Sequence, residues 1–311
     1  MKRNPLGRTG LAVSALSFGA SALGGVFRPV DVSEAIATVH AALEAGINYF
    51  DVAPAYGGGR SESLLGKALK GIDRSHYVLS TKVGKYTDPE RYGSDTLDYS
   101  AERIRLSLEA SAARLGTDYF DLIHIHDIEY QGRSKLEQAL TEGLETVLAL
   151  KREGRIGAVS FGIYPMDLWA RLFADYPIDA ALVHNHYCLN DTRLTTLLPT
   201  AEASGIGVIN ASPFASGLLT ERGPADWHAA SAEDRALFRR AAELCTERGV
   251  SISELAFQFA TSHPAIPTTM FSTASPASLR RCLEWHGKAA DPQLVAEVQA
   301  VLQPVIDKDW A

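Results

Sequence analysis

One strand–loop–helix unit is visible in residues 46–69, GINYFDVAPAYGGGRSESLLGKAL. Residues 48–52 form a short apolar run, which is typical of a buried strand. Residues 61–69 then show apolar positions at helical spacing, which predicts an amphipathic helix. The stretch therefore predicts a strand, a loop and a helix in that order.

The same alternation recurs along the whole chain. Strands that alternate with helices predict parallel pairing with right-handed crossovers, and eight such units favour a closed (β/α)8 TIM barrel over an open sheet. Segments 3–6 and 12–14 flank the turn Gly7-Arg8-Thr9-Gly10 and predict a β-hairpin that plugs the barrel. The residues after the eighth unit predict one extra C-terminal helix. The predicted strands are 15–18, 48–52, 77–81, 120–124, 156–161, 180–184, 207–211 and 266–270, and the predicted helices are 32–44, 61–69, 100–115, 135–152, 166–174, 191–203, 232–248 and 276–284.

Composition restricts the class of protein further. The chain has 311 residues, of which 46% are hydrophobic and 22% charged, and its net charge is −7. These values are typical of a globular protein, and the mildly acidic balance argues against nucleic-acid or anionic-membrane partners. The three cysteines are widely spaced and include no CxxC pair, so we expect neither a disulfide framework nor a thiolate zinc site. We expect a single barrel domain over residues 1–311, without a membrane segment, cytoplasmic, and monomeric or homodimeric.

Titratable side chains follow three consecutive predicted strands at the end where a barrel places its active site. In a (β/α)8 barrel this is the C-terminal end of the strands. Asp51 ends the second strand and Tyr56 follows it, Lys82 ends the third strand, and His124 and His126 end the fourth. We therefore expect these side chains to converge. The long segment 212–230, which follows the seventh strand, lies at the same end and is also a candidate for function.

These residue types suit proton exchange between a carbonyl and a hydroxyl group. The phenol of tyrosine has a pKa near ~10, and we expect the Lys82 ammonium to lower the pKa of Tyr56. Asp51 would hold that lysine, and a histidine would hydrogen-bond and orient a substrate oxygen. Amino-acid side chains supply no hydride, so a nicotinamide cofactor is implied. With Tyr56 as the base, oxidation should accelerate as pH rises.

Residues 46–57, together with Ser61-Glu62 and Leu65-Gly66, resemble the signature of the aldo-keto reductases. The resemblance continues at 6–11 (LGRTGL), 80–82 (STK), 119–126 (YFDLIHIH), 211–213 (ASP) and 217–220 (GLLT). It implies that Tyr56 exchanges the proton, that Lys82 and Asp51 tune it, and that His126 orients the substrate. His124 is then a second, inward-facing histidine.

Within that family, the sequence resembles the aldose 1-dehydrogenases, among them the L-galactose dehydrogenases. The matching residues are 17–21 (SFGAS), 23–27 (LGGVF), 126–129 (HDIE) and 223–231 (GPADWHAAS). The resemblance implies oxidation of an aldose such as L-galactose or L-fucose at C1 to its lactone. Related members act on pyridoxal, so another aldehyde or alcohol stays an alternative. The expected substrate contacts are Phe27, Tyr86, Asp127, Glu129 and Trp227.

The resemblance also implies a nicotinamide site. Members that prefer NADP carry Lys and Arg where this chain has Ser272 and Ser278, and a phosphate dianion binds best to fixed cations. We expect Arg280 and Arg281 to point away from Ser278, so NAD is the preferred cofactor, NADP is possible, and no metal is needed. The expected cofactor contacts are Gly19, Ala20, His184, Ser212, Pro213, Phe214, Ser216, Gly217, Leu218, Ser272, Thr273, Ser278 and Cys282.

Three positions depart from the family pattern around the nicotinamide. Many members have Ser-Asn where this chain has Gly162-Ile163, Gln at the position of His184, and a stacking Tyr at the position of Ala211. The contacts to the carboxamide and the stacking partner are therefore not assigned by the resemblance.

Two other function classes stay open. The pairs His124-x-His126 and His184-x-His186 could each aim two imidazoles at one metal ion, as in barrel metallohydrolases. Against this, the first strand has no histidine and no aspartate follows the eighth strand. A nicotinamide-binding sensor without catalysis is the third reading, and the complete Asp-Tyr-Lys-His set argues against it.

Overall fold

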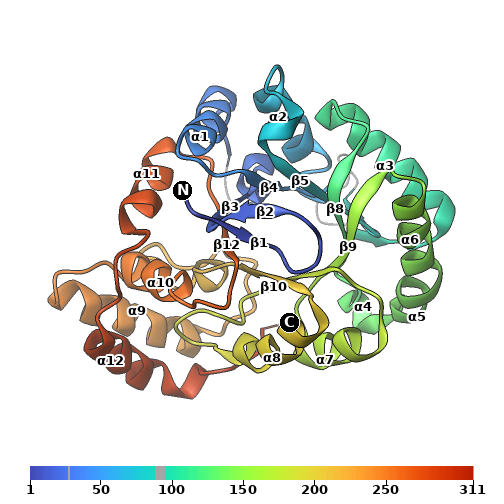
Figure 1. Cartoon of the computed structure of the whole chain (residues 1–311). Helices are drawn as coiled ribbons and strands as arrows, with labels where there is room; N and C mark the ends of the chain where they lie inside the picture. The colour runs from blue at the N-terminus through green and yellow to red at the C-terminus, as the bar shows by residue number, and fades with distance from the viewer. Residues whose placement is uncertain (27–28, 88–94, 311) are drawn as a thin grey trace.

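The computed structural model describes residues 1–26, 29–87 and 95–310. In this part of the chain, eight parallel strands form a closed barrel in the order β10–β11–β12–β3–β4–β5–β8–β9, and helices surround it (Figure 1). The predicted (β/α)8 fold class is confirmed. The barrel strands are β3 (Leu16–Gly19), β4 (Tyr49–Asp51), β5 (Val78–Val83), β8 (Phe120–His126), β9 (Ile156–Ile163), β10 (Ala180–His184), β11 (Gly207–Ala211) and β12 (Thr268–Ser272).

The barrel strands are short apolar runs because both faces of each strand are buried. All six residues of β5 and all five of β11 are buried, as expected when parallel strands are covered by helices outside and by one another's side chains inside. A cluster in the barrel interior joins Tyr49, Leu122, Ile209 and Met270. The core thus consists of an inner cluster and an outer layer between strands and helices.

The predicted N-terminal hairpin is present. Strands β1 (Arg3–Pro5) and β2 (Ala12–Ser14) pair antiparallel and lie across the middle of one end of the barrel (Figure 1). Leu6 and Val13 are fully buried in the same cluster as the inward residues of the barrel strands. The hairpin therefore closes the end of the barrel opposite to the expected active site.

The helices begin where the sequence offers capping side chains. Ser100 accepts a hydrogen bond from the Arg103 backbone N–H, and Ser231 forms a complete capping box with Asp234. The extra C-terminal helix α12 packs against α9. The helices are α1 (Val32–Glu44), α2 (Arg60–Leu69), α3 (Ala101–Leu115), α4 (Tyr130–Arg133), α5 (Leu136–Gln138), α6 (Leu144–Arg152), α7 (Met166–Asp175), α8 (Leu198–Ser204), α9 (Ala232–Glu247), α10 (Ile252–Ala260), α11 (Pro276–Trp285) and α12 (Pro292–Leu302).

Several boundaries differ from the prediction. The predicted helix 135–152 is α5 and α6, joined by a π-helical turn at 139–143. The predicted helix 191–203 starts later, because the Asp191 carboxylate bonds to other side chains, and α8 begins only at Leu198. The eighth strand starts at Thr268, after Pro267, which has no N–H to donate to a sheet. Helix α10 and the hairpin of β6 (Lys85–Thr87) with β7 (Asp95–Leu97) were not predicted.

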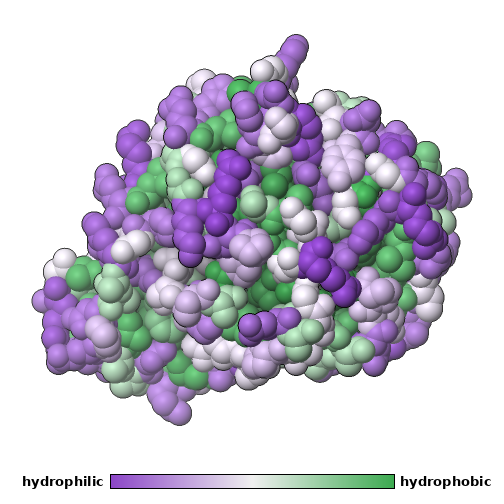
Figure 2. Space-filling model, in the orientation of Figure 1, coloured by the Kyte–Doolittle hydropathy of each residue, from purple (hydrophilic) through white to green (hydrophobic). Residues whose placement is uncertain are grey.

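Among the described residues, no helix is both long and apolar enough to cross a bilayer. On the face shown in Figure 2, hydrophobic side chains are interspersed among hydrophilic ones.

Candidate active site

The structure brings Asp51, Tyr56, Lys82 and His126 together at the C-terminal end of the barrel. Asp51 ends β4, Lys82 lies in β5, and His126 ends β8. Tyr56 follows in the loop before α2, and its ring centre lies 5.1 Å from Lys82 Nζ. The rings of Tyr56 and His126 are 5.9 Å apart and nearly perpendicular. Three adjacent strands and one loop thus assemble the predicted set.

Lys82 and Asp51 form a buried ion pair. The Lys82 ammonium hydrogen-bonds Asp51 Oδ2 and donates to the Val52 carbonyl at 3.0 Å. Ser80 Oγ donates to the other carboxylate oxygen, Oδ1, at 2.7 Å. Burial disfavours the carboxylate charge, but Lys82 and the neighbouring His124 outweigh it and hold the pKa of Asp51 below its usual value. A buried pair is retained at low cost only when its remaining polar atoms are satisfied, and here they are.

The expected pKa of Tyr56 is wrong in direction. Burial, followed by the negative charges of Asp51 and Asp127, raises the pKa of Tyr56 well above its ordinary value. Lys82 approaches the face of the Tyr56 ring, and its charge is already matched by Asp51. Tyr56 is therefore a neutral phenol in the chain without a ligand.

The two histidines of β8 have different surroundings. His126 faces Tyr56, and burial lowers its pKa to about 3, so its imidazole is neutral at physiological pH. His124 is fully buried two positions earlier, where Nδ1 pairs with Ser160 Oγ at 2.8 Å and Nε2 lies 3.2 Å from the Tyr49 hydroxyl. His124 therefore joins nearby strands inside the barrel by hydrogen bonds, below the site.

Two predicted substrate residues lie in the loop that follows His126. Asp127 Oδ1 is 3.5 Å from His126 Nε2. Glu129 is half-buried further along the loop, and its Oε1 accepts a hydrogen bond from the Tyr164 backbone N–H at 2.8 Å. Both carboxyl groups belong to the loop that follows β8.

The other predicted substrate residues have different positions. Tyr86 packs away from the tetrad, since its hydroxyl accepts from the Gly84 N–H at 2.9 Å and Arg103 of α3 covers its ring at 4.4 Å. We therefore do not place Tyr86 in the substrate site. Trp227 is 62% exposed in segment 212–230 and lies against His228. Phe27 lies outside the described residues.

Lys85 and Tyr130 lie beside Asp127 and are candidate site residues that the sequence pattern did not indicate. Lys85 Nζ lies 2.7 Å from Asp127 Oδ2 and 3.7 Å from the centre of the Tyr130 ring. Because Lys85 and Tyr86 are adjacent in β6, they point to opposite sides. This alternation could have indicated Lys85 from the sequence, because only one of two neighbouring strand residues can face the C-terminal end of the barrel.

The predicted cofactor residues gather on one side of the barrel. They follow β3, β10, β11 and β12, which are consecutive around the barrel. In the loop after β11, Ser212, Ala215 and Ser216 adopt left-handed backbone conformations with φ of 63°, 47° and 53°. Such strained residues concentrate where backbone must approach a ligand.

This side of the barrel fits a nicotinamide dinucleotide. Ser275 caps α11 and Pro276 opens it, so the first turn of this ten-residue helix, which carries Ser278, has a favourable dipole for an anion. Ser272 has a structural role as well, since its Oγ accepts from the Ala22 N–H at 2.9 Å and so ties β12 to the end of β3. Cys282 is buried, and burial raises its pKa to about 12, which makes it a neutral thiol.

Comparison with known proteins agrees with this geometry. The sequence model of the Aldo/keto reductase family matches residues 15–303. The chain belongs to this family. It is 39% identical to L-galactose dehydrogenase from Arabidopsis thaliana over 98% of this chain and 95% of that protein. It is 31% identical to pyridoxal 4-dehydrogenase from Microbacterium luteolum over 91% and 92% of the two chains.

A solved structure agrees with the fold of this aldo-keto reductase. An aldo-keto reductase from Bacillus halodurans in its holo form is 25% identical, with a TM-score of 0.78, and the match covers 100% of this chain and 98% of that one. Aldo-keto reductases are oxidoreductases that use NAD(P)H and need no metal.

One prediction about the cofactor side of the reductase is wrong. Arg281 does not point away from Ser278, because its Nη2 donates to Ser278 Oγ at 3.1 Å. Residues three positions apart share a helix face. A guanidinium therefore lies beside the first turn of α11, where the sequence analysis expected none.

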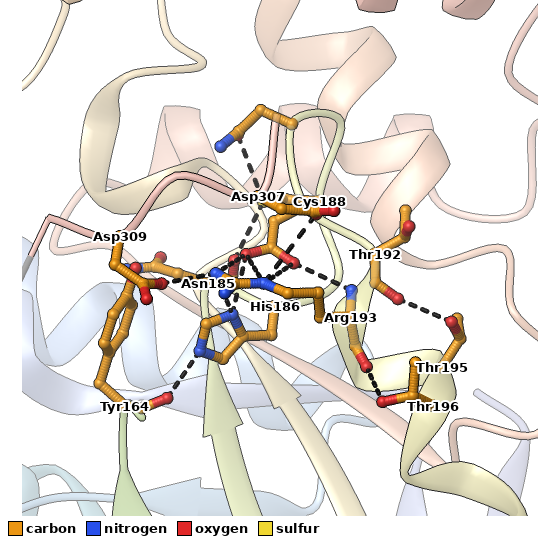
Figure 3. A network of polar contacts seen from close by, with 12 residues as sticks. Tyr164, Asn185, His186, Cys188, Thr192, Arg193, Thr195, Thr196, Asp307 and Asp309 are labelled. Carbon is orange, nitrogen blue, oxygen red and sulfur yellow. Dashed lines mark hydrogen bonds and ion pairs between the residues drawn. The ribbon is translucent and has the colours of Figure 1, made fainter. Parts of the chain in front are cut away.

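One histidine of the second pair, His186, has a structural role in the reductase. His186 Nδ1 pairs with Asp191 Oδ2 at 2.9 Å, and Nε2 pairs with the Tyr164 carbonyl at 2.6 Å, so both ring nitrogens are occupied (Figure 3). Within residues 1–26, 29–87 and 95–310, no group of three or more His, Cys, Asp or Glu side chains is arranged to hold a metal ion.

The same network fastens the C-terminal segment of the reductase. Arg193 Nη2 donates to Asp191 Oδ2 at 2.7 Å and to Asp309 Oδ1 at 2.5 Å (Figure 3). On the other side, Lys308 and Trp310 both donate to the Asp234 carboxylate, at 2.8 and 3.0 Å. Residues 307–310 thus join the loop after β10 to the start of α9.

Proposed function

We propose that this aldo-keto reductase is an NAD-dependent aldose 1-dehydrogenase, which oxidises L-galactose or a related sugar such as L-fucose at C1 to the aldonolactone. The observation that carries the proposal is the meeting of Tyr56, Lys82 and His126 next to the Asp127 carboxylate. A proton-exchanging group and a hydroxyl-binding group then lie side by side, as a sugar requires. The resemblance to L-galactose dehydrogenase supports the same substrate class.

The side chains divide the chemistry among them. The Tyr56 hydroxyl oxygen accepts the proton of the C1 hydroxyl, and the Lys82 ammonium stabilises the phenolate that this requires. Asp51 keeps Lys82 charged and in place through their hydrogen bond. His126, neutral and buried, hydrogen-bonds the same substrate oxygen and orients it. A bound nicotinamide dinucleotide would supply the hydride acceptor.

The preference for NAD is also a proposal. Ser272 and Ser278 carry no charge, and a 2′-phosphate dianion binds best to a fixed set of cations. Arg281 supplies one guanidinium at this place, on an exposed side chain whose contact is the neutral Ser278 hydroxyl. The single exposed cation would permit NADP to bind, whereas the two neutral serines favour binding of NAD.

A second candidate substrate is pyridoxal, since a pyridoxal dehydrogenase is 31% identical over nearly the whole chain. The carbon bonded to its aldehyde carbon is a ring carbon that bears no hydroxyl for Asp127 to bind. The proton chemistry of Tyr56 and Lys82 would be the same for either substrate, so the tetrad does not separate the two.

A substrate panel tests the proposal. Purified protein is mixed with L- and D-aldoses or pyridoxal, each with NAD⁺ and NADP⁺, and formation of reduced cofactor is followed by absorbance. We expect turnover of L-galactose or L-fucose with NAD⁺. Turnover of pyridoxal alone would replace the aldose assignment, and preference for NADP⁺ by severalfold would overturn the cofactor assignment.

A further inference from the structure

A buried charged cluster lies beside the tetrad, and the proton transfer does not use it. Its buried charges are Lys85 of β6 and Asp127 of the loop after β8, with the partly buried Glu129 of the same loop and the exposed Tyr130, the first residue of α4, beside them. Lys85 is 8% exposed and Asp127 is 6% exposed. Burying charges is costly unless they serve a partner, so the cluster requires an explanation of its own.

Asp127 is fixed in position from several directions. Its backbone has φ of 51°, a left-handed conformation that is uncommon outside glycine, and its N–H donates to the Gly162 carbonyl at 3.0 Å. Its Oδ2 accepts from Lys85 Nζ at 2.7 Å. Its Oδ1 lies 3.5 Å from His126 Nε2 and so faces the group that is proposed to orient the reacting oxygen.

Lys85 keeps Asp127 charged. Burial alone would lower the pKa of Lys85, but Asp127, Tyr130 and Asp95 outweigh it and raise that pKa well above its ordinary value. Lys85 Nζ lies 3.2 Å from Asp95 Oδ2 on its outer side and over the Tyr130 ring. The ammonium is therefore held on several sides and presents Asp127 as a rigid carboxylate. A carboxylate can accept about four hydrogen bonds, so Oδ1 retains capacity for a ligand.

We propose that Asp127, held by Lys85, accepts a hydrogen bond from the substrate hydroxyl on the carbon next to the reacting carbon. The inference rests on the proposed function, because it takes His126 as the group at the reacting oxygen. An acceptor adjacent to His126 Nε2 reaches the substituent adjacent to that oxygen, which in an aldose is the C2 hydroxyl.

The subsite defines a substrate class. Substrates with a hydroxyl on the adjacent carbon gain a hydrogen bond to a charged, desolvated acceptor, whereas analogues without it leave Asp127 unpaired. The enzyme therefore selects 2-hydroxy compounds over simple aldehydes and alcohols. Glu129 extends the same polar wall, since its Oε2 is buried and lacks a hydrogen-bond partner among the described residues.

The test pairs substrates with variants. L-Galactose and 2-deoxy-L-galactose are compared in wild type, Asp127→Asn, Asp127→Ala, Lys85→Met and the control Asp167→Asn. Asp167 is an exposed carboxylate in the first turn of α7, bound to Arg133 at 2.7 Å. If L-galactose is not turned over, the same comparison uses the best aldose of the panel and its 2-deoxy analogue. Thermal melting and circular dichroism verify that each variant is folded.

We expect wild type to favour the 2-hydroxy sugar by at least tenfold in kcat/KM. Asp127→Ala should lower the ratio of kcat/KM between that sugar and its 2-deoxy analogue at least tenfold, mostly through the KM of the 2-hydroxy sugar, because the effect of the lost charge on Tyr56 is common to both sugars. Asp127→Asn and Lys85→Met should reduce the discrimination partly, and Asp167→Asn should preserve it.

Two results would overturn the inference in distinguishable ways. Equal losses on both sugars in folded Asp127 variants, with aldose turnover retained in wild type, would remove the subsite and leave the proposed function. Absence of turnover with every aldose would remove the proposed function and the subsite with it.

Discussion

At the scale of single residues, the state of the Tyr56 proton governs the chemistry. Burial and the charges of Asp51 and Asp127 keep Tyr56 protonated, so oxidation requires its phenol to transfer a proton toward solvent, with Lys82 as the stabilising cation. Loss of a positioned acid–base group costs about 10²–10⁴-fold in rate. We therefore expect Tyr56→Phe to lower kcat for aldose oxidation at least 100-fold.

The Tyr56 variant should keep its fold and its cofactor affinity. The change removes one oxygen and leaves the ring against His126, so the melting temperature should change little. Tyr119→Phe, a change at an exposed tyrosine before β8, serves as the matched control and should retain full activity. Comparable turnover in Tyr56→Phe and wild type would show that another group exchanges the proton.

The pH dependence follows from the same residue. The deprotonated form of Tyr56 accepts the proton in oxidation, and its pKa lies well above its ordinary value. Below that pKa, the phenolate fraction grows about tenfold for each pH unit. We expect kcat/KM for aldose oxidation to rise from pH 7 to pH 10, and aldehyde reduction to show no such rise. A flat oxidation profile in wild type would contradict the role of Tyr56 as the base.

At the scale of elements, residues 307–310 act as a strap between the loop after β10 and α9. Arg193 anchors this strap by binding Asp309 within it and Asp191 in the loop after β10. The side chain of Asp191 is 2% exposed. Arg193→Ala removes a hydrogen-bonded cation from the buried Asp191 carboxylate, which also pairs with His186. We therefore expect a loss of about 1–3 kcal/mol in unfolding free energy. Hydrogen exchange at residues 306–310 should accelerate as the strap detaches.

An ordinary surface ion pair provides the control for the strap. Arg133 and Asp167 form an exposed pair at 2.7 Å, and Arg133→Ala should cost about 0–1 kcal/mol. Chemical denaturation measures both variants. Equal, small losses in the two variants would show that the Arg193 network adds nothing beyond surface pairing.

We expect the first turn of α11 to contribute to the cofactor preference. Arg281 lies beside Ser278, so Arg281→Ala should weaken NADPH binding severalfold and leave NADH binding unchanged, because only NADPH carries the 2′-phosphate. Fluorescence titration of each reduced cofactor measures the dissociation constants, with Arg280→Ala as the control. Equal weakening of both cofactors would place Arg281 away from the 2′-position.

Local sequence patterns predicted the repeated strands and helices. The parts of the site that depend on contacts between distant residues could not be predicted in this way. Each barrel strand is a short apolar run, so its existence was visible from the sequence. The pairing of Lys85 with Asp127 joins residues 42 positions apart, and the bond from Tyr164 to Glu129 joins residues 35 apart. No period in the sequence encodes such pairs. The raised pKa of Tyr56 was also missed, because the extent of burial depends on the assembled loops.

At the scale of the whole molecule, the barrel separates chemistry from stability. The tetrad and the charged cluster lie at the C-terminal end, and the hairpin closes the N-terminal end. The predicted plug was correct because the turn between its two short segments, 3–6 and 12–14, carries two glycines. Its partner was not predictable, since the hairpin turn meets residues 205–207, about 200 positions later.

Gly7 makes that closure possible. Its φ is +52°, and a Cβ there would overlap the Gly207 nitrogen and the Gly205 oxygen, which are backbone atoms that have no room to move. Gly7→Ala should therefore lower the unfolding free energy by about 2–4 kcal/mol through backbone strain and overpacking. Gly10→Ala is the matched control, with φ of +77° and open space around the added methyl, and should cost about 1–2 kcal/mol.

Denaturant titration measures the unfolding free energies of the Gly7→Ala and Gly10→Ala variants. The kcat of folded Gly7→Ala should stay near that of wild type, because the plug lies at the opposite end of the barrel from Tyr56. Equal stability losses in the two variants would show that the hairpin turn is not clamped against β11, and a large fall in kcat of folded Gly7→Ala would show that the two ends of the barrel are coupled.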